Sequence, residues 1–229
     1  MQPFDLSTIE GPHAGQPVIT EGPGPGKAAA ALILLHGRGS GAQQILGLGR
    51  TIVHSLGRRD LLLLAPHAMR STWYLPRFAE LKDPLDPWLV SARQAVDALI
   101  TKMTAGGIAR EKIFLLGFSQ GACLVADRAL RIPQRYGGLF ILSGASLPPA
   151  NREEDEPENP AANMEGTPVC IGCSQEDPHI PLARLRATEE ALRKASASVE
   201  TLVYPGAGHT VTPEEMSLVQ EILTRGIVS

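Results

Sequence analysis

The chain has 229 residues, of which 43% are hydrophobic and 20% charged, and its formal net charge is −3. A chain of this length can bury an extensive core within one large domain. No basic stripe predicts nucleic-acid binding, and no run approaches the roughly 18 apolar residues that a membrane-spanning helix needs. We therefore expect a single domain over residues 1–229, with neither nucleic-acid binding nor stable membrane insertion.

The start of the chain and its cysteines bear on the cellular compartment. Residues 1–30 lack the basic start and apolar centre of a signal peptide. Three cysteines, an odd number, argue against a disulfide framework and fit a reducing environment. We expect a cytoplasmic location.

The elements follow one another in a regular alternation. Residues 1–27 form an N-terminal segment with short β-like pieces, such as Val18-Ile19-Thr20, and a Gly-Pro connector over 22–26. Six later apolar runs have strand length: 31–35, 61–65, 112–116, 138–142, 168–172 and 199–204. Their continuous hydrophobicity is typical of strands covered on both faces. Apolar residues at helical spacing predict helices over 88–103 and 182–194. This alternation predicts an α/β fold, a mostly parallel central sheet with helices on both faces.

Two connections are too long to be simple turns. Residues 66–87 carry Trp73, Tyr74 and Phe78, and we expect this aromatic segment to fold over a pocket and contact substrate. For Trp73, a packed loop position and a pocket wall are equally favoured. Residues 145–167 are acidic and Pro-rich, which is typical of a solvated loop.

A serine lies at the junction between the apolar run 112–116 and an Ala-rich helical stretch. The junction reads Gly117-Phe-Ser119-Gln-Gly121. A G-x-S-x-G motif between strand and helix is typical of a nucleophile elbow, whose flanking glycines remove side chains that would collide. Because a serine hydroxyl is a weak nucleophile, Ser119 needs a histidine base and an acid to orient that base.

Two partners follow Ser119 in the chain order of α/β-hydrolases. Asp177 comes after the run 168–172, and His209 comes after the run 199–204. Both therefore leave the carboxyl ends of parallel strands, where open α/β sheets place their sites. Gly206 and Gly208 allow the His209 loop to bend toward Ser119.

Two choices concern the groups around this predicted triad. Glu176 competes with Asp177 because either carboxylate could orient an imidazole, and Asp177 is preferred because a proline follows it and fixes the turn.

The charge that develops on a carbonyl oxygen needs backbone donors. We assign these to the N–H groups of Gln120 and Arg38, with Gly39 as the alternative to Arg38.

The segments L-L-H-G-R-G, G-F-S-Q-G-A, the Asp-Pro loop and G-x-G-H together resemble the phospholipase/carboxylesterase family of α/β-hydrolases, which includes acyl-protein thioesterases. The resemblance covers the chain from about residue 30 onward. It implies a serine carboxylesterase or thioesterase with Ser119, Asp177 and His209 as the triad, eight strands, and little or no cap domain. It also favours Asp177 over Glu176. Arg38 and the length of 145–167 depart from the pattern of the thioesterase members.

The remaining histidines have less specific interpretations. We expect His36 to pack and hydrogen-bond beneath the loop that carries Arg38. His13 and His54 are predicted to lie on the surface, whereas His67 and His179 are candidates for lining the cleft without a catalytic role. No H-E-x-x-H or similar cluster predicts a metal, and no cofactor is expected.

Cys170 and Cys173 have the C-x-x-C spacing of redox proteins. Redox motifs of this kind lie at helix N-termini, where the thiol pKa is lowered. Here both thiols fall within a predicted strand, and their odd separation directs them to opposite faces. We interpret them, with Cys123, as buried structural thiols.

The sequence therefore predicts a serine hydrolase that cleaves short- to medium-chain carboxylic esters, and thioesters in the alternative, through an acyl-enzyme on Ser119. Lysophospholipase or acyl-protein thioesterase activity would use the same chemistry on another acyl group. A ligand-binding receptor on the same fold is the non-enzymatic alternative. The expected partner is a small-molecule ester, and a homodimer is left open.

Overall fold

The computed structural model describes residues 4–75, 83, 85–147, 163–206 and 208–228. Within these ranges one sheet contains β1 (Val18–Glu21), β2 (Ala30–Leu35), β3 (Leu61–Pro66), β4 (Ile113–Phe118), β5 (Gly138–Leu142), β6 (Pro168–Ser174) and β7 (Ser198–Tyr204). The α-helices in the same ranges are α1 (Ala42–Leu56), α2 (Pro87–Ala105), α3 (Gln120–Arg131), α4 (Leu182–Lys194) and α5 (Pro213–Val228). Phe78 and most of the acidic stretch in 145–167 lie outside the described residues.

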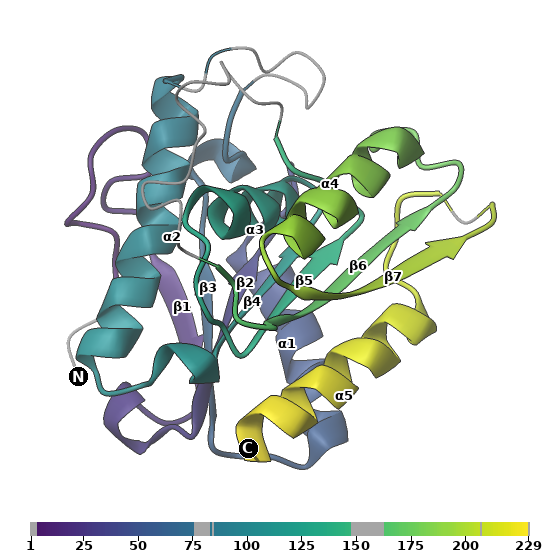
Figure 1. Cartoon of the computed structure of the whole chain (residues 1–229). Coiled ribbons are helices and arrows are strands. Elements are labelled where there is room, and N and C mark those ends of the chain that lie inside the picture. The colour runs from purple at the N-terminus through teal and green to yellow at the C-terminus, as the bar shows by residue number, and fades with distance from the viewer. Residues whose placement is uncertain (1–3, 76–82, 84, 148–162, 207, 229) are drawn as a thin grey trace.

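The strands lie in the order β1-β3-β2-β4-β5-β6-β7. All pairs are parallel except β1 with β3, and β4 is flanked by β2 and β5 near the centre of the sheet (Figure 1). The six predicted runs and the β-like piece at 18–20 all form strands, so the mostly parallel sheet is confirmed. The described residues contain seven strands in this sheet, whereas the family resemblance implied eight.

Side chains of the central strands alternate between two apolar layers. Ile33 and Leu115 belong to the layer that packs against α2, α3 and α4. Leu32, Leu34 and Leu116 belong to the layer that packs against α1 and α5. Burying each such leucine stabilises the fold by about 1.5–3 kcal/mol. Helices thus cover both faces of the sheet, as the continuous hydrophobicity of these runs predicted (Figure 1).

The last strand differs from the prediction. The run 199–204 was expected to be covered on both faces, but most side chains of β7 are only partly buried. The reason is position: β7 is an edge strand whose single neighbour is β6. The loop that follows it therefore starts from a poorly packed edge.

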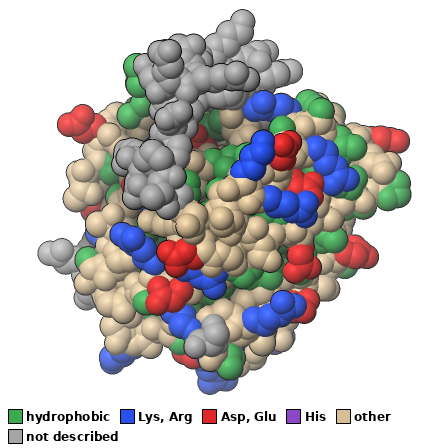
Figure 2. Space-filling model, viewed as in Figure 1, with side chains coloured by type: hydrophobic (Ala, Val, Ile, Leu, Met, Phe, Trp, Pro, Cys, Tyr) green, Lys and Arg blue, Asp and Glu red, His purple; other side chains and the backbone are tan. Residues whose placement is uncertain are grey.

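The helices begin and end close to where the sequence placed them. The predicted helix 88–103 is α2, which starts after Asp86, whose carboxylate accepts hydrogen bonds from the N–H groups of Trp88 and Leu89. The predicted helix 182–194 is α4, where Lys/Arg and Asp/Glu side chains alternate on the surface (Figure 2). Ion pairs on α4 account for this, among them Arg193 with Glu189 at 2.8 Å.

Candidate active site

The turn between β4 and α3 holds Ser119 in a left-handed backbone conformation, with φ 55° and ψ −118°. A Cβ atom added at Gly117 would lie 2.3 Å from the Gly121 oxygen, and one at Gly121 would lie 2.1 Å from the Leu35 oxygen. Both positions therefore require glycine. A serine in this conformation costs about 1–3 kcal/mol, a strain that folded proteins store mainly at functional sites. The geometry is that of a nucleophile elbow.

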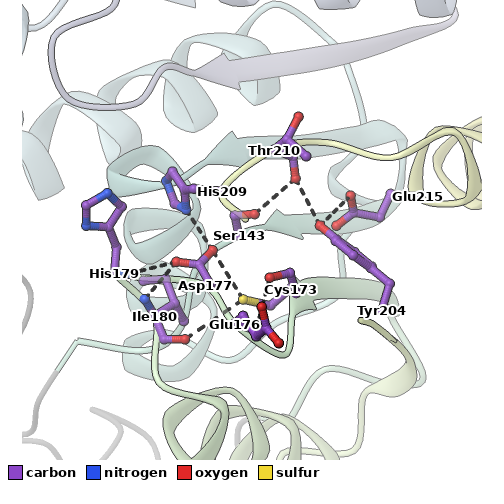
Figure 3. Close-up of polar contacts among 11 residues, drawn as sticks. Ser143, Cys173, Glu176, Asp177, His179, Ile180, Tyr204, His209, Thr210 and Glu215 are labelled. Carbon is purple, nitrogen blue, oxygen red and sulfur yellow. Dashed lines mark hydrogen bonds and ion pairs between the residues drawn. The ribbon is translucent and has the colours of Figure 1, made fainter. Parts of the chain in front are cut away.

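The carboxyl ends of β6 and β7 bring an acid and a histidine into contact. The distance between Asp177 Oδ2 and His209 Nδ1 is 2.7 Å (Figure 3). The Asp177 side chain is 0% exposed, and that of His209 is 17% exposed. Because a carboxylate can only accept, His209 Nδ1–H donates, which leaves Nε2 as the basic nitrogen.

The protein holds Asp177 in its charged form. Burial acts to raise the pKa of this carboxyl, but hydrogen bonds from His209 and from the N–H groups of His179 and Ile180 outweigh burial, so the pKa lies below its ordinary value. The two N–H groups lie 2.8 and 3.0 Å from Oδ1. A carboxylate fixed in this way can orient an imidazole and stabilise its protonated form.

A thiol adds a further contact to the same acid. Cys173 Sγ lies 3.4 Å from Asp177 Oδ2, the oxygen that also faces His209. Burial raises the pKa of Cys173 to about 12, so the thiol stays protonated and donates. Cys170 lies in the opposite apolar layer, and all three cysteines are free and buried. The prediction of structural thiols on opposite faces is confirmed.

The competing acid lies elsewhere. Glu176 is exposed, and its backbone N–H donates to Ser174 Oγ at 3.2 Å. In the part of the chain that the structure describes, the Glu176 carboxylate has no hydrogen bond to His209. Of the two acids that the sequence left open, Asp177 is the one that contacts the histidine.

The contact between the elbow and His209 is made by Phe118, the residue before Ser119. The rings of Phe118 and His209 lie 5.0 Å apart, centroid to centroid, at 47°. The Ser119 hydroxyl forms no hydrogen bond within the described ranges, so its contact with His209 is not closed in this arrangement. In free enzymes catalytic hydrogen bonds are often long and tighten when substrate binds.

The loop after β2 lies directly against the elbow. A Cβ atom added at Gly37 would lie 3.2 Å from Ser119 Cβ. The N–H of Gly39 donates to the Ser71 carbonyl oxygen at 2.8 Å, so this donor is engaged within the protein. Gly39 is therefore a poor candidate for an oxyanion donor. The N–H of Arg38 stays the predicted donor in this loop. The N–H of Gln120 is the other predicted donor, and it lies in the first turn of α3, where N–H groups have no acceptor within the helix.

His36 supports this loop from below, as predicted. Its Nδ1–H donates to the Gly37 carbonyl at 2.8 Å, and its Nε2 accepts from the N–H of Ala68 at 3.1 Å. Burial lowers the pKa of His36 to about 4. The ring is therefore neutral at physiological pH, and protonation of Nε2 would break the bond to Ala68.

The predicted substrate contacts of Trp73 and Tyr74 need correction. Trp73 is 0% exposed and Tyr74 is 1% exposed, so neither presents surface to a ligand. Trp73 Nε1–H donates to the His36 carbonyl at 2.9 Å, and its ring lies 5.1 Å from that of His36. Of the two interpretations of Trp73, the structure has the packed loop aromatic. The side chain is buried because its polar edge finds an acceptor in the interior.

Side-chain roles that the sequence did not indicate hold the same region together. Gln120 Oε1 accepts from the N–H of Trp73 at 2.8 Å, and Nε2 donates to the Tyr74 carbonyl at 2.7 Å. The Arg38 guanidinium donates to the carbonyls of Tyr74 and Leu75 at 2.8 and 3.0 Å. These bonds tie the start of α3 and the loop after β2 to residues 73–75. No pattern in the sequence marks them, because the partners of these side chains are backbone groups.

His13 is the clearest error among the histidines. It was predicted on the surface, but it is fully buried, with Nε2–H donating to the Trp73 carbonyl at 2.9 Å and Nδ1 accepting from the N–H of Met69 at 3.1 Å. His54 is exposed, as predicted. His179 is exposed and its ring meets that of His209 edge-on at 4.8 Å, which agrees with a position at the cleft.

Other features of the surface do not compete with this site. Two depressions of about 530 and 570 Å³ lie over α4 and between β1 and α1, and their linings contain neither Ser119 nor His209. Among the described residues, no group of three His, Cys, Asp or Glu side chains could hold a metal ion. A search of the same residues finds no helix of the length and hydrophobicity needed to cross a bilayer.

Comparisons with known proteins identify similar sequences and a similar fold. A family model described as phospholipase/carboxylesterase matches residues 15–227. The crystal structure of a phospholipase/carboxylesterase from Dyadobacter fermentans superposes with a TM-score of 0.81 at 30% identity, covering 92% of this chain and 97% of that one. Acyl-protein thioesterase 1 of Gibberella zeae is 32% identical over 127 residues, which are 56% of this chain and 53% of the relative. Carboxylesterase SOBER1 of Arabidopsis thaliana is 27% identical over 159 residues, 69% and 68% of the two chains. The matched part is about half the length of the first of these curated relatives.

Proposed function

The chain belongs to the phospholipase/carboxylesterase family, and we propose that it is a serine hydrolase that cleaves carboxylic esters through an acyl-enzyme on Ser119. The observation that carries the proposal is the 2.7 Å contact between His209 and the buried Asp177, formed beside the strained elbow of Ser119. Thioesters are the second substrate class, because the same groups act on either bond.

The first step forms the acyl-enzyme. Ser119 Oγ attacks the carbonyl carbon while His209 Nε2 takes its proton, and the carbonyl π electrons move to the oxygen. Asp177 keeps Nδ1 protonated and balances the charge that His209 acquires. The tetrahedral intermediate then expels the alcohol or thiol, which receives the proton from His209.

Donors aimed at the oxyanion lower the barrier of this step. We assign them to the N–H groups of Gln120, in the elbow, and of Arg38, in the loop after β2. The N-terminus of α3 adds its dipole at the same point. One such donor is worth about 2.7–4 kcal/mol.

The second step releases the acid. Water gives a proton to His209 Nε2 and attacks the acyl carbon, and Ser119 Oγ leaves with that proton. Ester and water thus become carboxylic acid and alcohol, and the enzyme returns to its starting state. No other group is needed to balance the reaction.

The proposed preference is for short to medium acyl chains. Trp73 and Tyr74, which were predicted to wall an acyl groove, are buried. Near the loop after β2, the exposed apolar side chain that the described residues offer is Leu75, at 52% exposed. Each buried methylene is worth about 0.8 kcal/mol, so a small apolar surface favours short chains. Acyl-protein thioesterase and lysophospholipase activities remain alternatives within the same chemistry.

Labelling with a fluorophosphonate tests the proposal and separates an enzyme from a ligand-binding receptor. The wild-type protein should gain one phosphonyl group, located on Ser119 by peptide mass spectrometry, and Ser119→Ala should gain none. Ser217→Ala, at an exposed serine on α5, is the matched control and should label normally. A wild-type chain that stays unlabelled would favour the receptor.

Two substrate series then define the bond. p-Nitrophenyl esters of increasing chain length should be hydrolysed best at the short end, and acyl thioesters of the same lengths measure the thioester alternative. The cytoplasmic location, the single-domain organisation and a homodimer stay predictions, and light scattering on the purified chain tests the last of these.

A further inference from the structure

The loop that carries His209 is attached to the interior through the backbone of the next residue. The Thr210 carbonyl oxygen accepts from Tyr204 OH at 2.9 Å and from Ser143 Oγ at 3.2 Å (Figure 3). Tyr204 ends β7, and Ser143 follows β5 in a left-handed conformation with φ 51°. Hydroxyl groups at the ends of two strands, β5 and β7, therefore donate to the carbonyl of the residue that follows His209.

Among the described residues of 205–210, the other hydrogen bond to the rest of the protein joins His209 to Asp177, at 2.7 Å. The loop leaves β7 at the poorly packed edge of the sheet. Gly206 and Gly208 adopt φ values of 63° and 72°, a region where glycine imposes no steric penalty. A glycine-rich loop at a sheet edge gains its orientation from hydrogen bonds, because packing supplies few constraints.

A buried glutamate completes the arrangement. Glu215 is 0% exposed, and its Oε2 accepts from the N–H of Thr212 at 2.7 Å and lies 3.3 Å from Tyr204 OH. Thr212 Oγ1 accepts in return from the N–H of Glu215 at 3.2 Å. Thr212 and Glu215 thus form a capping box at the start of α5. Tyr204 has one hydroxyl proton, which it shares between the nearer acceptor, the Thr210 carbonyl, and Glu215 Oε2.

The burial of Glu215 goes beyond what a helix cap requires. A Cβ atom at Gly172 would lie 2.0 Å from Glu215 Oε1, so β6 leaves room for this carboxyl by carrying glycine there. Oε1 is buried without a hydrogen-bond partner in the described chain, which is costly. Burial raises the pKa of Glu215, against the opposing effect of its hydrogen bonds from Thr212 and Tyr204. An exposed glutamate would cap α5 equally well, so its place beside Tyr204 points to a second role.

We propose that Ser143, Tyr204 and Glu215 are positioning residues that hold the His209 loop in the place where His209 meets Asp177 and from which it reaches Ser119 in the proposed reaction. The inference rests on the proposed function, in which His209 is the base. Ser143 and Tyr204 hold the Thr210 carbonyl, and Glu215 holds the Tyr204 hydroxyl. None of the three touches the reacting atoms.

Loss of the hydrogen bonds of these three residues lowers the fraction of molecules in which His209 is placed to act as the base. That fraction multiplies the rate of the chemical steps and leaves the affinity for a small ester unchanged. Tyr204→Phe and Ser143→Ala should each lower kcat about 2- to 10-fold on p-nitrophenyl acetate, as expected for one net hydrogen bond. The double variant should lose more than either single variant, and KM should stay within about twofold of wild type.

A spectroscopic readout separates positioning from stability. The proton between His209 Nδ1 and Asp177 Oδ2 should give a downfield proton NMR resonance, which His209→Gln removes and so assigns. In the double variant this resonance should broaden or disappear while the protein stays folded by circular dichroism. Glu215→Gln keeps an acceptor for Thr212 and a partner for Tyr204, so it should retain kcat within about threefold, whereas Glu215→Ala should not.

Ile222→Val is the control for destabilisation, because Ile222 is buried on the same helix, α5, and lies against Gly138 at the start of β5. It should lower Tm and leave kcat and the resonance unchanged. A double variant with wild-type kcat and an intact resonance would overturn the inference, as would a Glu215→Gln variant as inactive as Glu215→Ala. If Ser119→Ala is inactive while the double variant is normal, this inference alone fails. If Ser119→Ala is active, the proposed function fails.

Discussion

The two sides of the candidate site are built differently. On one side, the loop after β2 is set between central strands and held by His36, Trp73 and Gln120, all buried and all hydrogen-bonded to backbone groups. On the other side, the loop of His209 leaves an edge strand, contains two glycines at positive φ, and is tied down through Thr210. Several independent contacts hold the loop after β2, whereas the loop of His209 depends on a few hydrogen bonds.

The difference agrees with what each side would do in the proposed reaction. Donors that stabilise an oxyanion work best when they are fixed in advance, because reorganisation during the reaction would cost energy. A general base must pass protons between a serine, a leaving group and water, so small adjustments of His209 are required. Substitutions in the loop after β2 and its supports should therefore act mainly on stability, and those around His209 mainly on kcat.

The largest effect should come from the residue between the two sides. Ser119→Ala should lower kcat by about 10⁵- to 10⁶-fold, as removal of a serine nucleophile does in other hydrolases. Thermal unfolding should change little, because the Ser119 hydroxyl makes no hydrogen bond within the described residues. Stopped-assay kinetics on p-nitrophenyl acetate and a melting curve measure both. Residual activity near wild type would refute the assignment of Ser119.

On the histidine side, Asp177→Asn should lower kcat by about 10⁴-fold, because a neutral amide neither balances the charge on His209 nor selects its Nδ1–H tautomer. Glu176→Gln is the matched control at the adjacent acid and should change kcat by less than about threefold. Steady-state kinetics of the two variants compare them directly. If their effects were exchanged, the orienting carboxylate would be Glu176.

On the oxyanion side, Trp73→Ala should lower the free energy of unfolding by about 3–5 kcal/mol, because it empties a large buried site. It should leave the chain-length profile of the remaining folded enzyme unchanged, since Trp73 has no surface for an acyl chain. Urea unfolding and the p-nitrophenyl ester series measure the two properties. A stable variant with an altered chain-length profile would restore Trp73 as a groove residue.

The same side should respond to pH through His36, whose pKa burial lowers from 6.5 to about 4. Between these values the unfolded chain binds a proton that the folded protein excludes. The contribution of neutral His36 to the free energy of unfolding is therefore fully present above pH 6.5 and is lost as the pH drops toward 4. The loss is at most about 3 kcal/mol.

The variant His36→Gln should be less stable than wild type at pH 7.5, but its free energy of unfolding should decline less steeply as the pH falls. Urea unfolding at several pH values measures both. His13, whose pKa burial also lowers, adds a decline of the same sign to both proteins. Equal slopes for the two proteins would contradict this role of His36.

The smallest effect should come from the thiol beside Asp177. Cys173→Ala removes the S–H donor to Oδ2 and should lower kcat by about 2- to 5-fold, with Cys173→Ser closer to wild type because it keeps a donor. Cys170→Ala alters the other apolar layer and serves as the control, with a change in Tm but not in kcat. Equal kcat values for Cys173→Ala and wild type would show that the contact has no effect on catalysis.

Much of the fold could be read from local patterns. The apolar runs become β2 to β7 because their length and hydrophobicity report burial within the same few residues, and the glycines at 117 and 121 mark a turn that admits no side chain. The error on β7 has a physical cause: a run of apolar residues does not reveal whether a strand has one neighbour or two. The pairing of Thr212 with Glu215 was also present in the sequence, as a T-x-x-E capping pattern, and was missed.

The sequence by itself determined the order of Ser119, Asp177 and His209 and the strand ends from which they project, because these depend on local hydrophobicity and on chain order. Only the tertiary structure decided which of two adjacent acids meets His209, that the N–H of Gly39 is engaged by Ser71, and that His13 and Trp73 are buried. Each of these outcomes depends on contacts between segments distant in the chain. Such contacts are selected by packing and by the pairing of buried polar groups, which no single segment encodes.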